Sequence, residues 1–168
     1  MTTQISIEPI TQRSFAKYGD LITTDGAKNP IPVNQGRGRK YAMPSQFTGK
    51  DTSIQATRSS LYSISPSTLP FILTLMEKHP NSTQLFIPMA AADFLVIVSQ
   101  GDDRPDLSTV KAFMARPDQG IHYKQGIWHA PLAVINGTST FYCHTFDLDD
   151  GKDTVEYRLT PQEIISVS

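Results

Sequence analysis

Short apolar runs, each about as long as one β-strand, recur along this chain between Pro, Gly, Asn or Asp residues. Helical periodicity is nearly absent after Gly19. Runs of this length and spacing favour a β-sandwich or barrel over a doubly wound α/β fold. The runs that we expect as strands are residues 60–64, 71–76, 84–88, 94–99, 110–114, 133–135 and 141–146.

The start of the chain combines a strand pattern with a short helix. Residues 4–10 alternate polar and apolar side chains, as a half-buried strand does. Thr11 can cap the helix that follows, in which Phe15 and Tyr18 share a face and Gly19 supplies the stop signal. We therefore expect a mainly β barrel with one short N-terminal helix.

Two other stretches have a less direct interpretation. Residues 25–39 are rich in Gly, Pro and Asn, so we expect an ordered loop that crosses a barrel mouth. Residues 69–78 are expected to be extended. A helix there is the alternative, because Leu75 and Met76 tolerate either state.

The charge balance excludes several classes of partner. The chain carries 15 basic and 16 acidic residues, a formal net charge of −1, and no basic run. Such a chain lacks the clustered positive charge with which proteins bind the phosphates of nucleic acid. No apolar run approaches the roughly 18 residues of a membrane span. The N-terminal MTTQISIEPI also lacks the charged leader and apolar core of a secretory signal.

Composition also bears on domain count and compartment. The 12 prolines and 10 glycines are spread along the chain, and we find no repeat or low-complexity block. One domain over residues 1–168 is therefore expected. The single cysteine, Cys143, sits in the strand-like FYCHTF and cannot form a disulfide within the chain. A reducing cytoplasm is the expected location.

Two segments place a histidine between strand-like runs, and together they predict a metal site. The first carries Glu77-x-His79 with Gln84 five residues on, and the second carries Gly126-x-x-His129. Alternate side chains of a strand point the same way, so Glu77 and His79 would both face a barrel interior. The resulting shell of Glu77, His79, Gln84 and His129 suits nickel, manganese, iron or zinc.

The pattern departs from that of ordinary cupin barrels, in which an H-x-H…E cluster is completed by a later G-x-x-H turn. Glu77 stands where the first His would be and Gln84 where the Glu would be. Lys124 replaces the usual Pro and Ala133 the usual Asn. Because Gln is a weaker ligand than a carboxylate, we expect weak or exchangeable metal.

Each of these residues also has a simpler interpretation. Either His could be a hydrogen-bonded structural residue, Glu77 a solvated strand-edge charge and Gln84 a loop hydrogen-bonder. Trp128 is expected to pack in the barrel and not to serve as a substrate platform.

Several motifs in order carry a family resemblance. They are EKHP at 77–80, TQLFIP at 83–88, PDLST at 105–109 leading to Ala112 and Phe113, and GIHYKQGIWHAP at 120–131, with weaker agreement at SFAKYGD, 14–20, and NQG, 34–36. In this order they resemble the ureidoglycolate lyase family, called ureidoglycolate hydrolase in older usage. The similarity covers nearly the whole chain.

The resemblance implies a fold and an activity. The fold is a cupin-like double-stranded β-helix, or jelly-roll barrel. The activity is that of a carbon–nitrogen lyase of the amidine-lyase class, which splits (S)-ureidoglycolate into glyoxylate and urea. This reaction recovers allantoin nitrogen in purine degradation. Members are soluble and often dimeric, so a homodimer is expected, and nickel has been associated with the family.

The resemblance also implies residue roles. We expect His79, His129 and Glu77 to be catalytic, with His129 or His79 serving the substrate hydroxyl, directly or through a metal. The residues expected to bind substrate are Asn34, Arg39, Gln84, Tyr123 and Lys124. Packing is an alternative role for Tyr123, and surface exposure for Lys124.

One family feature is absent from this chain. An Arg that often precedes the run ending at Pro70 is replaced by Ser63. If that Arg holds the substrate carboxylate, another cation must substitute for it. Arg39, Lys40 and Lys124 are the candidates.

Other functions remain open on the same residues. A ureidoglycolate amidohydrolase would release ammonia, and a metal-dependent oxygenase could use His79, His129 and Glu77 as a two-His-one-carboxylate triad. A sugar epimerase, or a non-enzymatic cupin that binds a small ligand, would also suit the barrel. His122 and His144 fall on no family motif and are expected to be non-catalytic.

Overall fold

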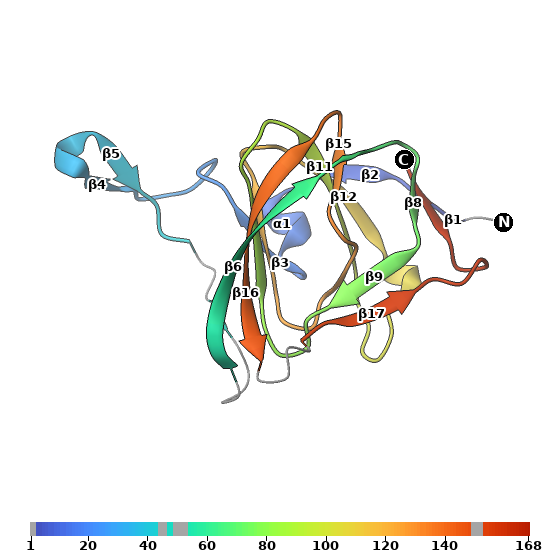
Figure 1. Ribbon diagram of the computed structural model, residues 1–168. Coiled ribbons are helices and arrows are strands. Elements are labelled where there is room, and N and C mark those ends of the chain that lie inside the picture. The colour runs from blue at the N-terminus through green and yellow to red at the C-terminus, as the bar shows by residue number, and fades with distance from the viewer. Residues whose placement is uncertain (1–2, 44–46, 49–53, 149–152) are drawn as a thin grey trace.

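The computed structural model in Figure 1 describes residues 3–43, 47–48, 54–148 and 153–168. Its two larger sheets enclose a common core. The five-stranded sheet has the order β3 (Gly19–Ile22), β13 (Gly120–Tyr123), β10 (Gln84–Pro88), β16 (Ser139–Leu148) and β6 (Ile54–Ile64). The eight-stranded sheet has the order β17 (Val155–Arg158), β9 (Leu75–Lys78), β14 (Trp128–His129), β11 (Asp93–Ser99), β12 (Lys111–Ala115) and β2 (Ile7–Pro9), with β15 (Ala133–Ile135) on β11 and β7 (Pro66–Ser67) on β15.

Smaller elements complete the architecture. A three-stranded sheet has the order β1 (Thr3–Ile5), β18 (Ile165–Val167) and β8 (Phe71–Leu73). The short elements are α1 (Gln12–Phe15), the 3₁₀ turns η1 (Asn34–Gly36) and η2 (Leu107–Thr109), and the hairpin strands β4 (Ile31–Val33) and β5 (Gly38–Lys40). The mainly β, cupin-like barrel with a short N-terminal helix is thereby confirmed.

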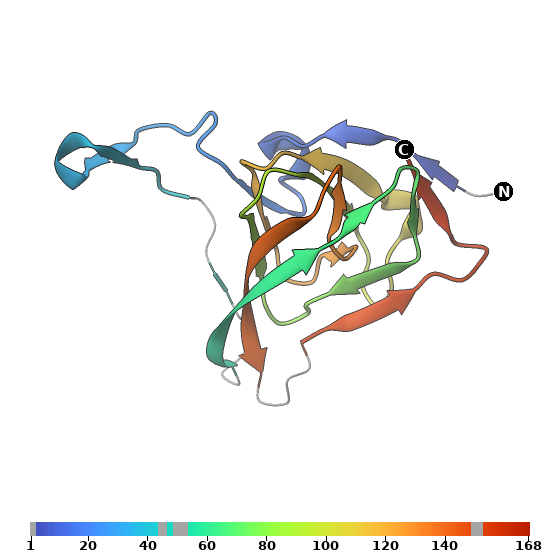
Figure 2. The ribbon, with the colours of Figure 1, turned by 45° about the horizontal axis from the view of Figure 1, so that its top comes forward.

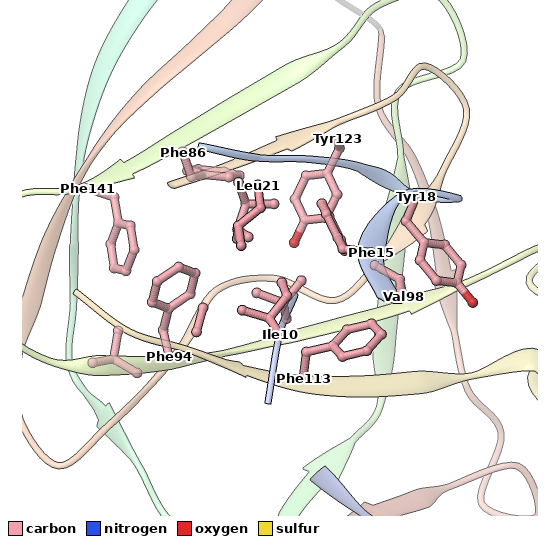
Figure 3. Packing of buried hydrophobic residues seen from close by; sticks show 14 of the residues in the cluster. Ile10, Phe15, Tyr18, Leu21, Phe86, Phe94, Val98, Phe113, Tyr123 and Phe141 are labelled. Carbon is pink, nitrogen blue, oxygen red and sulfur yellow. The ribbon is translucent and has the colours of Figure 1, made fainter. Parts of the chain in front are cut away.

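An aromatic core joins the two larger sheets (Figure 3). Phe94 of β11 meets Phe141 of β16 edge to face, with ring centroids 5.0 Å apart. Phe113 of β12 meets Phe15 of α1 in the same way at 6.2 Å. All four rings are at most 1% exposed. Burying each stabilises the fold by roughly 1.5–3 kcal/mol, which fixes how the sheets face each other.

Strand β11 is apolar on both faces because both faces are covered. Phe94, Val96 and Val98 belong to the core between the sheets, whereas Leu95 and Ile97 belong to a second apolar cluster. That second cluster includes residues of β8 and β18, so the three-stranded sheet covers the outside of the barrel here. A continuous apolar run is typical of a strand buried on both faces.

The N-terminal helix begins as predicted but ends early. The Thr11 hydroxyl accepts the N–H of Ser14 at 3.0 Å, and the helix ends at Phe15. Gly19 lies instead in β3, where an added Cβ would come within 2.1 Å of the His122 carbonyl oxygen. The glycine is therefore needed for the close approach of β3 to β13, not as a helix stop.

The alternative of a helix over residues 69–78 is wrong, since β8 and β9 occupy this stretch. Residues 25–39 also differ from the expected loop across a barrel mouth. Among the strands that the structure describes, β4 and β5 pair only with each other, and they stand clear of the barrel (Figures 1 and 2). Positive φ angles of 52°, 57° and 85° at Asn34, Gln35 and Gly36 reverse the chain. We call residues 31–40 the arm.

Among the described residues, no helix has the length and apolar character needed to cross a bilayer.

Candidate active site and metal centre

Strand register brings the predicted polar residues together. Glu77 in β9 lies directly opposite His129 in β14, and Gln84 at the start of β10 lies opposite Tyr123 in β13. Glu77 and His79 face the same side, as the alternation predicts. One ligand atom from each of Glu77, His79 and His129 lies within 4.8 Å of the others. The two distant histidines therefore share one site.

His129 is held in a defined orientation. Its ring is 1% exposed and stacks on Tyr123, with centroids 4.1 Å apart and planes 13° apart. Nδ1–H donates to the Ile127 carbonyl at 2.9 Å, so the lone pair of the neutral ring is on Nε2. Nε2 lies 3.5 Å from Glu77 Oε1 and 3.1 Å from Gln84 Oε1.

The contact between His129 and Gln84 depends on protonation. A neutral His129 accepts an N–H from the Gln84 amide, whose oxygen and nitrogen can exchange places by a flip. A protonated His129 donates to the Gln84 oxygen at 3.1 Å and faces the Glu77 carboxylate. Gln84 therefore suits either protonation state of the imidazole.

His79 presents an unpaired ring nitrogen to the site. Its Nδ1–H donates to the Asp153 carbonyl at 2.9 Å. Its Nε2 is buried and has no hydrogen-bond partner among the described residues. The His79 and His129 rings lie 5.5 Å apart. An orphaned buried nitrogen is costly unless a ligand or ion pairs with it, so this atom points to an occupant.

Asp153 is a site-positioning residue that sequence reasoning missed. Its carboxylate accepts the backbone N–H of Asn81 at 2.9 Å and the hydroxyl of Ser82 at 2.5 Å. These bonds fasten the segment around residue 153 to the turn after His79. The contact spans more than 70 residues of sequence, and no motif or spacing signals it.

The electrostatics of the site follow from burial and mutual charge. Burial alone would raise the pKa of Glu77, but the hydrogen bond and charge of His129, with the charge of His79, bring it below its usual value. Burial, reinforced by the charge of His129, lowers the pKa of His79. Burial raises the pKa of Tyr123, so its hydroxyl stays protonated. The site therefore holds a carboxylate beside two imidazoles.

These residues fit a divalent metal. The lone pairs of both Nε2 atoms and the Glu77 carboxylate converge, and each Nδ1–H is fixed by a backbone carbonyl. A second hydrogen bond of this kind is usual for metal-binding histidines. Two nitrogens and one carboxylate oxygen suit a borderline ion. Gln84 is the adjacent polar group that could complete the shell.

Other predicted substrate residues lie elsewhere. The ammonium group of the exposed Lys124 donates to the Ala16 carbonyl at 2.5 Å. Asn34 and Arg39 are exposed on the arm, which stands away from the barrel (Figure 2). Trp128 is fully buried, and its indole N–H donates to the Asp102 carbonyl, in accord with the packing role expected of it.

His122 and His144 lie outside the site. Both pair in register with Leu85 of β10, whose neighbours Gln84 and Phe86 are the buried residues of that strand. The two rings contact the exposed Phe47, at 4.9 and 4.6 Å between centroids. They therefore occupy the face of the five-stranded sheet that points away from the core.

Comparison with known proteins decides the family. A family model described as ureidoglycolate lyase matches residues 2–166. The chain belongs to the ureidoglycolate lyase family. It is 36% identical over 139 residues to a ureidoglycolate lyase of Burkholderia mallei strain NCTC 10229, covering 82% of this chain and 79% of that one. It is 33% identical over 163 residues to a ureidoglycolate lyase of Escherichia coli strain SMS-3-5, covering 95% and 96%.

Solved structures of similar shape are more distant. One is a dTDP sugar isomerase from Desulfovibrio desulfuricans G20, with a TM-score of 0.45, 14% identity, and 87% and 85% of the two chains covered. Another is a dTDP-4-dehydrorhamnose 3,5-epimerase from Elizabethkingia anophelis NUHP1, with a TM-score of 0.44, 11% identity, and 89% and 91% covered. Neither likeness bears on the chemistry of this chain.

Proposed function

We propose that this member of the ureidoglycolate lyase family cleaves ureidoglycolate to glyoxylate and urea at the cluster of Glu77, His79, His129 and Gln84. The observation that carries the proposal is the convergence of a buried imidazole, His129, and a half-buried one, His79, each with Nδ1 bonded to a carbonyl, on one carboxylate. Family membership over residues 2–166 supplies the substrate.

The reaction requires two proton transfers and no attacking water. In ureidoglycolate one carbon bears a hydroxyl, a carboxylate and the ureido nitrogen. Removal of the hydroxyl proton lets the C–O bond become the aldehyde of glyoxylate as the C–N bond breaks. The electron pair of that bond leaves with nitrogen, which takes a proton to give urea. A pair of imidazoles can serve both ends of this cleavage.

The geometry favours distinct roles for the two histidines. His79 Nε2 has no partner among the described residues, so it is the base proposed to take the hydroxyl proton. His129 in its protonated form carries a proton on Nε2, and Glu77 at 3.5 Å stabilises that charge. His129 therefore delivers the proton to the departing nitrogen. Gln84, next to His129, is placed to bond the ureido group.

A divalent metal held by the same residues is the second form of the proposal, with nickel favoured by the family and manganese, iron or zinc as alternatives. Glu77, His79 and His129 would hold the ion. When bound, it would act as a Lewis acid that lowers the pKa of the substrate hydroxyl. An Nε2 atom that coordinates the ion cannot also take up or deliver a proton, so the metal-bound form and the acid–base form described above are alternatives. Metal content and activity must therefore be measured on the same preparation.

The cytoplasm is the proposed compartment. The one cysteine, Cys143, is buried and free. Burial raises the pKa of its thiol to about 12, which keeps it protonated and unreactive. A chain without disulfides suits a reducing environment.

Product analysis tests the function. Purified protein is incubated with racemic ureidoglycolate, and urea, ammonia and glyoxylate are quantified together with oxygen consumption. Equal amounts of urea and glyoxylate from half of the racemate are expected, because one enantiomer is cleaved. Ammonia in place of urea would identify an amidohydrolase, and oxygen uptake an oxygenase. Tight binding without turnover would identify a ligand-binding cupin.

A further inference from the structure

Tyr62 of β6 faces the barrel interior. It lies opposite Phe141 in the register of β6 and β16, and directly opposed residues of an antiparallel pair point to the same face of the sheet. Phe141 is fully buried in the core between the two larger sheets. The Tyr62 side chain therefore points to the same side as the core residues.

Ring contacts connect Tyr62 to the candidate active site. Its ring meets Phe86 edge to face, with centroids 5.7 Å apart. Phe86 meets Tyr123 in the same way at 6.4 Å, and Tyr123 is the ring that stacks on His129. Phe86 also follows Gln84 by two residues on β10, so both side chains point to one face. Tyr62 is therefore held on the side of the interior that carries Gln84 and His129.

The Tyr62 hydroxyl donates to a weak acceptor, the Cys143 thiol. This hydrogen bond raises the pKa of the tyrosine and lowers that of the cysteine, as expected when the phenol is the donor. Burial, with the charges of Cys143 and Glu77, also raises the pKa of Tyr62, so the hydroxyl keeps its proton. Because sulfur accepts hydrogen bonds weakly, a carbonyl oxygen brought beside this hydroxyl would take the bond from Cys143.

Glu77 places the hydroxyl within the site. The charge of its carboxylate raises the pKa values of three groups, those of Tyr62, Tyr123 and Cys143. Tyr62 is 41% exposed, whereas Tyr123 and Cys143 are 3% and 1% exposed. Of these three groups, Tyr62 is therefore the one that an entering substrate can reach.

The uncharged end of ureidoglycolate suits a position near Glu77. A substrate carboxylate there would meet like charge, whereas the ureido carbonyl oxygen is a neutral acceptor. The departing nitrogen must lie at His129 for its protonation, which brings the ureido group to the same end of the site. As the C–N bond breaks, its electron pair spreads from nitrogen onto the carbonyl oxygen until the nitrogen takes its proton. A donor at that oxygen stabilises this charge.

We propose that Tyr62 is a further catalytic residue, whose hydroxyl leaves the Cys143 thiol and donates to the ureido carbonyl oxygen of the substrate. The inference rests on the proposed function for the identity of the substrate. His129 protonates the nitrogen of the departing urea, and Tyr62 stabilises the charge on its oxygen. Because that charge is larger in the transition state than in the bound substrate, the bond acts mainly on kcat.

A conservative substitution tests this role. Tyr62→Phe removes only the hydroxyl and keeps the ring that packs on Phe86. It should lower kcat for ureidoglycolate about ten- to a hundredfold and leave KM within about threefold. A folded Tyr62→Phe protein with the kcat of the wild type overturns the proposal and leaves the lyase function intact. A wild type that releases no urea from ureidoglycolate overturns both.

Tyr142→Phe is the matched control for Tyr62→Phe. Tyr142 follows Phe141 on β16, so it points to the other face of the sheet, where its hydroxyl bonds to that of Ser59. The same chemical change there should leave kcat within about twofold. Equal losses of kcat in the two variants would contradict a specific role for Tyr62.

A second variant separates contact with the substrate from an effect through the cysteine. Cys143→Ala removes the acceptor that holds the Tyr62 hydroxyl in the free protein. If Tyr62 acts on the substrate, kcat should stay within about twofold of the wild type. A loss as large as that of Tyr62→Phe would show that the Tyr62 and Cys143 pair is structural, which overturns the proposal. A raised KM at unchanged kcat in Tyr62→Phe overturns it as well.

Discussion

Glu77 and His129 lie directly opposite each other on β9 and β14, with Oε1 and Nε2 3.5 Å apart. The pair is set by strand register and not by a loop, so it is positioned by the main-chain ladder. Tyr123, stacked on the imidazole at 4.1 Å, belongs to the aromatic core. The site is therefore attached rigidly to the barrel at the end of its core.

Removing either imidazole should abolish most of the activity. His79→Ala and His129→Ala are each expected to lower kcat/KM by on the order of a hundredfold or more, because each removes one proton transfer. Steady-state urea release measures the loss. His144→Ala, on the outer face of the sheet, is the matched control and should retain activity. Two folded variants with full activity would exclude the proposed mechanism.

Removing the carboxylate of Asp153 should destabilise the fold near His79. Asp153→Ala leaves the Asn81 N–H and the Ser82 hydroxyl without their acceptor. Unfolding in denaturant should show a loss of about 2 kcal/mol, since each buried unpaired group costs roughly 1–3 kcal/mol. Asp118→Ala, at a fully exposed carboxylate, should leave the free energy of unfolding close to that of the wild type. Equal stability of the two variants would show that Asp153 does not anchor this turn.

Much of the site was predictable because every second side chain of a β-strand points to the same face of the sheet. The spacing of Glu77 and His79 places both on one face once the segment is extended. The spacing of apolar residues alone does not exclude a helix over residues 69–78, and the structure shows strands there. The partnership with His129 was predicted from the Gly126-x-x-His129 turn by comparison with the pattern of cupin barrels, since two distant histidines have no local signal that joins them.

The rest of the site depends on contacts that are remote in sequence. Asp153 supports His79 from a segment more than 70 residues away.

The arm lies outside the site and also differs from its prediction. Its composition, rich in Gly, Pro and Asn, predicts a loop, whereas Asn34 and Gly36 serve to reverse a hairpin. The direction in which such a hairpin leaves the barrel depends on the packing of the whole chain, which composition does not encode.

Acidification should lower the free energy of unfolding in two successive pH ranges. Burial lowers the pKa values of His79 and His122 below 6.5, so the folded chain binds fewer protons than the unfolded chain as pH falls through 6.5. The pKa of Glu77, below 4.5 when folded, adds stability above pH 4.5 that is lost at lower pH.

Denaturant unfolding at a series of pH values measures this effect. The free energy of unfolding should fall between about pH 7.5 and pH 5.5, and fall again below about pH 4.5. His122→Gln removes one of the two histidines with a lowered pKa and should flatten the first step, while Arg116→Gln, at an exposed site, should not. Stability that is constant from pH 7.5 to 5.5 would contradict the lowered histidine pKa values.

A divalent metal should stabilise the folded chain through the Glu77, His79 and His129 cluster. The ligand atoms converge only when the barrel is formed, so an ion that binds there favours the folded state. After dialysis against a chelator, nickel at about 100 times its dissociation constant should add about 2.7 kcal/mol to the free energy of unfolding. Thermal melting under nickel titration follows the gain without any need for turnover.

The same titration on variants assigns the site. His129→Ala should lose the nickel-dependent rise in melting temperature, whereas His144→Ala should keep it, because only His129 belongs to the cluster. Manganese, iron and zinc are compared in turn, since the nitrogen and oxygen donor set accepts each of them. A wild-type melting temperature that none of these ions raises would make the cluster a metal-free acid–base pair. A rise that survives in His129→Ala would place the ion at another site.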